Sequence, residues 1–216
     1  MQFAISMEEP MAGHIVYAFA VSVDGYIASA QGGGDLVKLV ADDERHPLHV
    51  NVIGLPVPEE ALHRHFNEMQ KRTALNLYGR NMYEVMKCWD APPAESPEFE
   101  QEYARAWQGT PKVVFSTTLE SVGPNARLVK EKADMERTVR QLKAETNGEI
   151  GVNGAGLAAS LVRFGLVDEF LLYMMPVVLG GGKPYFEAGL QLELEPLGAE
   201  RLPQHCTLLR FRPKKS

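Results

Sequence analysis

The sequence predicts a single α/β domain built on a mostly parallel mixed sheet, with flanking helices and antiparallel strands at its carboxyl end. Along most of the chain, short apolar runs typical of strands alternate with stretches whose apolar residues recur at helical spacing. The run over 15–21 (IVYAFAV) is apolar almost throughout, as expected of a strand covered on both faces. Two late stretches, 190–197 and 206–211, alternate polar and apolar residues, which is typical of a hairpin or of edge strands.

Length and composition favour one large domain over two small ones. With 216 residues and 45% hydrophobic content, the chain can bury one substantial core, and we assign residues 13–216 to it. Residues 1–12 show no periodicity, and we expect a flexible N-terminal extension with Met11 as an alternative start.

Charge and cysteine usage exclude several function classes. The net charge of -6 comes from interspersed acidic and basic residues, with no basic block longer than Lys214–Lys215, so we expect neither nucleic acid nor membrane as a partner. No apolar run approaches the roughly 20 residues of a membrane span, and the start lacks a secretory signal, so we expect a cytoplasmic protein. Cys88 and Cys206 have no CxxC partner; we expect buried thiols and no metal site.

The first half of the chain gives the early elements in order. The turn at 22–25 ends the first strand, and the segment 29–57, rich in glycine and proline, is either a lid over the active site or an inert insertion. A helix follows, with Leu62, Phe66 and Met69 at its apolar positions. A strand over 74–78 and a second helical stretch through Met86 come next.

The remaining elements follow the same alternation. Ser96 is expected to cap a helix with Pro97 in its first turn. The later elements are a strand over 112–116, a helix through Met135, Val139 and Leu142 that stops near Gly148, a strand over 149–152, a glycine loop over 153–156, a helix through Leu157, Leu161 and Phe164 that ends at Gly165, and a strand over 169–175.

Three segments that follow predicted strands have the chemistry to bind phosphate. In the loop 153–156, glycines let backbone N–H groups approach an anion at a helix N-terminus, although such loops also serve as plain tight turns. Arg80 could pair with a phosphate, or it could be an ordinary surface arginine. The hydroxyls of 116–118 could bind a phosphate or begin a turn. Because open α/β sheets bind ligands at the carboxyl ends of their strands, the three together are more informative than each alone.

Four blocks then carry a family resemblance: AVSVDGYIA (20–28), LYGRNMYEVM (77–86), VVFSTTLE (113–120) and the long block 151–186. In order and spacing they resemble the signature blocks of the dihydrofolate-reductase-like superfamily, in particular the reductase domain of the bifunctional riboflavin-biosynthesis deaminase-reductase. The resemblance implies a dihydrofolate-reductase-like fold that binds NADP(H).

The resemblance also implies cofactor-binding residues. Gly79 and Arg80 match a turn that faces the adenosine 2′-phosphate, which favours NADPH over NADH, and Ser116 and Thr117 match hydroxyls near the same phosphate. The other matches are Gly154, Ala155, Gly156 and Leu157 at the pyrophosphate, and Ala20 and Ile27 at the nicotinamide. Asn81 and Met82 fill the next two positions of the turn, where the family usually has a basic or polar residue and then threonine. The chain therefore lacks one hydroxyl donor there.

For the substrate pocket the sequence nominates Asp24, His63 and Phe66, and no catalytic residue is assigned. Asp24 could instead cap neighbouring backbone N–H groups. His63 and His65 are two residues apart, so at most one faces the pocket, and both could face solvent. The glycine-rich turn 179–184 either helps to close the substrate site or is a flexible connection.

These assignments predict an NADPH-dependent reductase that transfers hydride to a C=N or C=O bond of a small pteridine- or pyrimidine-like substrate, with ordered water as one source of the proton. The alternatives are 5-amino-6-(5-phosphoribosylamino)uracil reductase of riboflavin biosynthesis and, in another class, a non-catalytic nucleotide-binding module. Because the family commonly pairs subunits and the C-terminal strands offer an edge, we also expect a homodimer.

Overall fold

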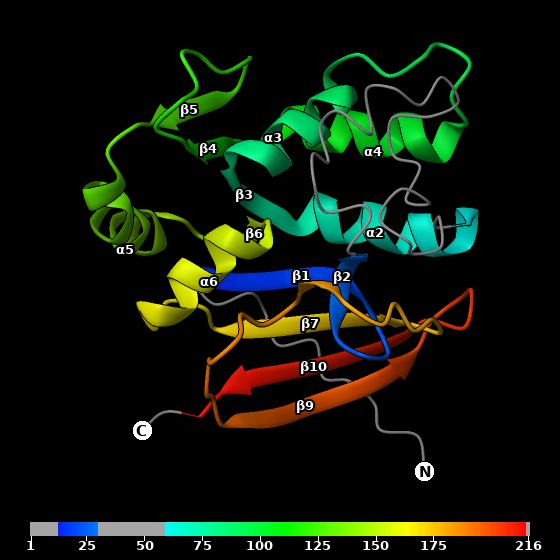
Figure 1. The fold of residues 1–216 in the computed structure, drawn as a ribbon. Helices are drawn as coiled ribbons and strands as arrows, with labels where there is room; N and C mark the ends of the chain where they lie inside the picture. Colours follow the sequence, from blue (N-terminus) through cyan, green and yellow to red (C-terminus); the bar gives the residue numbers. More distant parts are fainter. Residues whose placement is uncertain (1–12, 30–58, 215–216) are drawn as a thin grey trace.

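The computed structural model describes residues 13–29 and 59–214 (Figure 1). The predicted extension over 1–12 lies outside these residues, as does the segment predicted as lid or insertion, apart from Ser29. The described residues form a sheet of eight strands in the order β5-β4-β3-β6-β1-β7-β10-β9, and a small second sheet of β2 and β8. The strands are β1 (His14–Ser22), β2 (Tyr26–Ser29), β3 (Thr73–Gly79), β4 (Lys112–Phe115), β5 (Ala126–Val129), β6 (Glu149–Asn153), β7 (Glu169–Met175), β8 (Gly182–Pro184), β9 (Leu194–Arg201) and β10 (Thr207–Pro213).

The order and direction of the strands position the site. From β5 to β7 every neighbouring pair is parallel, whereas β10 runs antiparallel to both β7 and β9. The carboxyl ends of β4, β3, β6, β1 and β7 therefore meet at one edge of the sheet, where open α/β folds bind their ligands. The predicted fold class, a mixed and mostly parallel sheet with antiparallel C-terminal strands, is confirmed.

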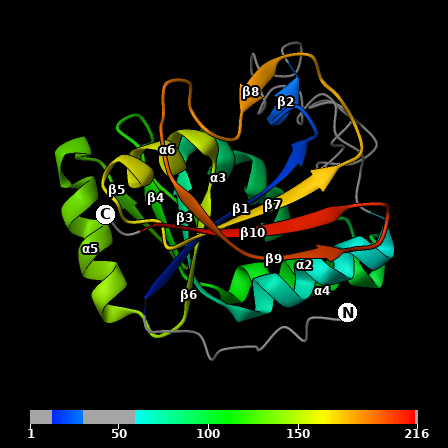
Figure 2. The same cartoon turned by 90° about the horizontal axis from the view of Figure 1, so that it is seen from below.

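Helices cover both faces of the sheet (Figures 1 and 2). They are α2 (Glu60–Arg72), α3 (Arg80–Met86), α4 (Glu98–Gly109), α5 (Met135–Glu145) and α6 (Ala155–Arg163), with short 3-10 turns η2 (Lys87–Asp90) and η3 (Lys132–Asp134). Alternate residues of a strand point to opposite faces, so that Ile15 joins the core cluster that includes α5 and α6 residues, whereas Val16 joins the cluster beneath α2. A third cluster lies around α3 and α4.

Two details of the sequence prediction are wrong. Pro97, and not Ser96, is the N-cap residue of α4, and no side chain caps this helix. The first C-terminal strand begins at Leu194 rather than at 190, because its pairing with β10 is fixed by the hairpin turn that precedes Thr207.

The sequence prediction also missed the strands β2, β5 and β8. They have four, four and three residues, and none has three consecutive β-branched or aromatic residues, as the equally short β4 has at 113–115. Among the described residues, no helix combines the length and the apolar composition that crossing a membrane requires.

Candidate functional site

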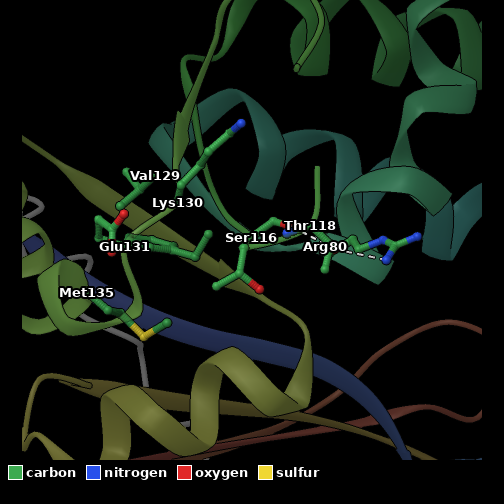
Figure 3. Close-up of a pocket in the computed structure, with 9 residues that line it drawn as sticks. Arg80, Ser116, Thr118, Val129, Lys130, Glu131 and Met135 are labelled. Carbon is green, nitrogen blue, oxygen red and sulfur yellow. Dashed lines mark hydrogen bonds between the residues drawn. The ribbon is translucent and has the colours of Figure 1, made fainter. Parts of the chain in front are cut away.

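A pocket opens at the carboxyl ends of β4 and β5, beside the start of α3 (Figure 3). Its volume is about 250 Å³. It brings together Arg80, which follows β3, and the three hydroxyl residues 116–118, which follow β4. Its lining consists of Arg80, Phe115, Ser116, Thr117, Thr118, Val129, Lys130, Glu131 and Met135.

Arg80 is held in place within this pocket. Its Nη1 donates a hydrogen bond of 2.9 Å to Oγ1 of Thr118, and its Nε lies 3.6 Å from a carboxylate oxygen of Glu84 one turn along α3. Ser116 is buried, and its Oγ accepts hydrogen bonds from the backbone N–H groups of Thr118 at 3.2 Å and Leu119 at 3.0 Å. The turn after β4 is thus fixed by Ser116, and it presents Thr118 to the guanidinium.

The charge of the pocket is mixed. Arg80 and Lys130 contribute positive charge and Glu131 contributes negative charge, and all three residues are exposed. Lys130 and Glu131 directly follow β5 and approach the pocket opposite Arg80 (Figure 3). Sequence reasoning missed both, because β5 was not predicted; the signal was the charged pair after the apolar Leu128–Val129.

The glycine loop lies at the next strand end in the sheet, that of β6. Gly154 has φ +107, a backbone conformation that disfavours any side chain, and it is the N-cap residue of α6. The first helical hydrogen bond runs from Ala158 N–H to Gly154 C=O, so the N–H groups of 155–157 lack acceptors within the helix. A β-carbon on Gly156 would meet nothing within 4 Å. The side of Gly156 on which a side chain would stand is therefore open.

The loop and the pocket adjoin each other. A β-carbon on Gly79 would lie 3.9 Å from Cβ of Leu157, and one on Gly154 would lie 3.3 Å from Cβ of Met82. Met82 thus packs against the glycine loop, whereas Asn81 is exposed. The structure therefore brings the predicted phosphate-binding segments of β3, β4 and β6 together at one edge.

The two residues assigned to the nicotinamide lie on and beyond β1, next to β6 in the sheet. Ala20 is half-buried and packs with the cluster beneath α2. Ile27, on β2, is 4% exposed and belongs to the cluster on the opposite face. They border the carboxyl end of β1 from its two sides.

The two α2 residues assigned to the substrate pocket, His63 and Phe66, contact different elements of the fold. The Phe66 ring packs edge-on against Tyr173 of β7, with 5.0 Å between centroids, and so faces the sheet. His63 does not share that face. Its ring lies 5.0 Å from Phe99 and 5.6 Å from Tyr103, and its Nδ1 is 3.0 Å from Oδ1 of Asn67. His63 therefore packs towards α4, whereas Phe66 faces the sheet, and the assignment of both residues to the substrate pocket stays a prediction.

Asp24 is engaged with backbone groups. Its carboxylate accepts hydrogen bonds from the N–H groups of Leu179 at 3.0 Å and Gly180 at 2.7 Å, and from the Ser22 hydroxyl at 2.6 Å. The Ser22 hydroxyl, followed by these N–H groups, lowers the pKa of Asp24 below its ordinary value. The capping alternative thus describes its contacts, although two of the capped groups lie far away in the sequence.

Comparisons with known proteins relate the chain to a family and to solved structures. The model of the family described as "RibD C-terminal domain" matches residues 13–208. An uncharacterized protein of Bacillus subtilis (strain 168), YyaP, is 29% identical over 173 residues, which are 80% of this chain and 79% of that protein.

Two solved structures share the fold. A putative riboflavin biosynthesis protein from Shewanella sp. PV-4 superposes with a TM-score of 0.63 at 22% identity, over 94% of this chain and 99% of that one. A dihydrofolate reductase from Enterococcus faecalis, in complex with NADP(H), superposes with a TM-score of 0.53 at 11% identity, over 95% and 99%.

Proposed function

Because the chain belongs to the RibD C-terminal domain family, we propose that it is an NADPH-dependent reductase that transfers hydride to a C=N or C=O bond of a small heterocyclic substrate. One observation carries the proposal. The pocket with Arg80, Ser116, Thr117 and Thr118 adjoins the glycine loop before α6, so one edge of the sheet offers two neighbouring anion sites. A dinucleotide with an additional phosphate on its adenosine ribose carries two anionic groups, one for each of these sites.

The residues present fit this cofactor. Arg80, fixed by Thr118, would hold the 2′-phosphate with Ser116 and Thr117, and the N–H groups of 155–157 would hold the pyrophosphate. The next strand in the sheet, β1, would place Ala20 beside the nicotinamide. Bound NADPH would supply the hydride, while the chain supplies orientation and the exclusion of water.

The substrate class is open between two candidates. A pteridine- or pyrimidine-like ring suits the relatives, one named a dihydrofolate reductase and one a putative riboflavin biosynthesis protein. The second candidate, reduction of 5-amino-6-(5-phosphoribosylamino)uracil, is favoured by the family of the chain. Against it, the sequence offers no extra basic cluster for the phosphate of that substrate.

Cofactor binding and turnover test the proposal in turn. Titration with NADPH comes first, followed by NADPH oxidation with a panel of pteridines, quinoid compounds and pyrimidines that includes the phosphoribosylamino compound. Turnover on one of them supports the reductase. Tight binding without turnover on any of them would favour the alternative of a nucleotide-binding module.

We also propose a homodimer formed by the C-terminal strands. β9 is one of the two edge strands of the sheet. Leu197 on β9 and Leu192 just before it are exposed large apolar residues. Pro196 removes one backbone donor from that edge, so contact through the face of the hairpin is favoured over strand-to-strand pairing. Light scattering at micromolar concentration should give about twice the chain mass, and a monomeric mass would refute the dimer.

A further inference from the structure

Two turns at the carboxyl edge are tied together by hydrogen bonds. The turn after β1 and the glycine-rich turn after β7 are connected by Val23 N–H to Val177 C=O at 2.8 Å and by Tyr185 N–H to Gly25 C=O at 3.0 Å. The pairing of β2 with β8 continues this connection (Figure 2). Residues 22–29 and 177–185 therefore form one unit beyond the ends of β1 and β7, which we call the edge clasp.

Three further hydrogen bonds of the edge clasp converge on the Asp24 carboxylate. Both carboxylate oxygens are used, Oδ1 by Leu179 N–H and the Ser22 hydroxyl, and Oδ2 by Gly180 N–H. Ser22 is fully buried, and its Oγ also accepts the N–H of Tyr26 at 2.9 Å, the first residue of β2. A single carboxylate thus links the end of β1, the start of β2 and the glycine-rich turn.

The glycine-rich turn needs such an anchor. Gly180, Gly181 and Gly182 have φ values of +72, +151 and +134, and a β-carbon on Gly180 or Gly181 would meet nothing within 4 Å. Contacts at Gly180 and Gly181 themselves therefore do not select this conformation, although Val177 and Leu179 before them pack against the cluster beneath α2. Because glycine backbone has many accessible conformations, hydrogen bonds from outside the turn must hold it in one of them.

The clasp lies where the far end of a dinucleotide would reach. The pocket with Arg80 is at the ends of β4 and β3, and the sheet order continues through β6 to β1 and β7. Three strand spacings from β3 to β7 amount to roughly 14 Å. A cofactor that extends along the edge from Arg80 past the glycine loop would bring its nicotinamide to the clasp, which also carries Ile27.

We propose that Asp24 is a positioning residue that fixes the wall of the nicotinamide site by clasping the turn 177–182 to β2, and that it is not the proton donor. This inference rests on the proposed function. A carboxylate that accepts three hydrogen bonds is held in its ionised form, and proton donation would require the acid form and the loss of those bonds. Asp24 therefore acts on the cofactor through Ile27 and the turn.

Two measurements on Asp24→Asn and Asp24→Ala test this inference. The first is hydrogen exchange of the cofactor-free chain. We expect peptides that cover 177–185 to exchange about tenfold faster in Asp24→Ala, since the amides of Leu179 and Gly180 lose their acceptor, and to a smaller extent in Asp24→Asn, whose amide keeps one acceptor oxygen. Asp24→Glu, which keeps the charge, should restore part of the protection. The control is Glu193→Gln, which removes an exposed carboxylate paired with Lys214 on the distant hairpin.

The second measurement compares NADPH with 2′,5′-ADP, which has the 2′-phosphate but no nicotinamide. We expect the variants to bind NADPH about tenfold more weakly and 2′,5′-ADP within twofold of the wild type. Unchanged exchange at 177–185 would overturn the clasp, and an equal loss of affinity for both ligands would overturn its role at the nicotinamide. If the wild type binds neither ligand, the proposed function fails together with that role, while the exchange result still decides whether Asp24 holds the turn.

Discussion

Replacement of Arg80 by alanine should narrow the proposed preference for NADPH over NADH. The side chain lines the pocket, and its donation to Thr118 fixes the direction of the guanidinium. A charged hydrogen bond contributes about 1.5–3 kcal/mol when it is well shielded. The Arg80 side chain is 49% exposed, so solvent weakens the interaction, and we expect about 1–2 kcal/mol. That loss corresponds to roughly a 5- to 30-fold smaller ratio of the NADH and NADPH dissociation constants.

The assay is a titration of both cofactors, followed by nicotinamide fluorescence, against the wild type and three variants. Thr118→Val should give a smaller effect in the same direction, because it frees the guanidinium without removing it. Arg105→Ala is the matched control, since this arginine lies on α4 and pairs with Glu98 outside the pocket. It removes the same charge and should leave the ratio unchanged.

Glu131 tests the same electrostatic reasoning with the opposite sign. Glu131 lines the pocket with its negative charge, so Glu131→Gln should strengthen NADPH binding while leaving NADH binding nearly unchanged. A ratio that stays the same in Arg80→Ala, or that falls equally in Arg105→Ala, would refute the placement of the 2′-phosphate in this pocket.

Three further changes test the loop, the core and the response to pH. Gly156→Val should abolish NADPH binding with little loss of melting temperature, because its β-carbon would enter open space. Gly154→Val should lower both the NADPH affinity and the melting temperature, since φ is +107 at this position. Equal losses of melting temperature in the two variants would mean that the loop is chiefly structural. Lys112→Met should lower the free energy of unfolding in urea by about 2 kcal/mol, because the buried ammonium donates to the carbonyls of Trp107 and Thr110; an unchanged midpoint would contradict this. The hydrogen bond to Glu169 raises the pKa of His14 above its ordinary 6.5, so the stabilisation of the fold by protonated His14 is present at about pH 6 and declines as the pH rises through the raised pKa. His14→Gln should remove this decline from the free energy of unfolding measured between about pH 6 and pH 8. A decline that persists in the variant would assign it to another group.

Much of the fold could be predicted from the sequence because its elements are long enough to show a period. The run over 15–21 and the apolar triplet Leu62, Phe66 and Met69 each mark an element that the structure contains. The glycine loop before α6 could also be located, since Gly154 and Gly156 stand between a predicted strand and a predicted helix. These features are local, and local sequence determines them.

Other features depend on contacts between distant segments, and only the tertiary structure decided them. Lys130 and Glu131 line the pocket because β5 pairs with β4, and the four residues of β5 carry no pattern that predicts this pairing. His63 and Phe66 lie on one helix, yet the packing of α4 draws the first away from the sheet. The carboxylate of Asp24 accepts a hydrogen bond from the backbone N–H of Leu179, which lies 155 residues further along the chain. Periodicity predicts which elements form, whereas the pairing of strands and the packing of helices decide which side chains meet.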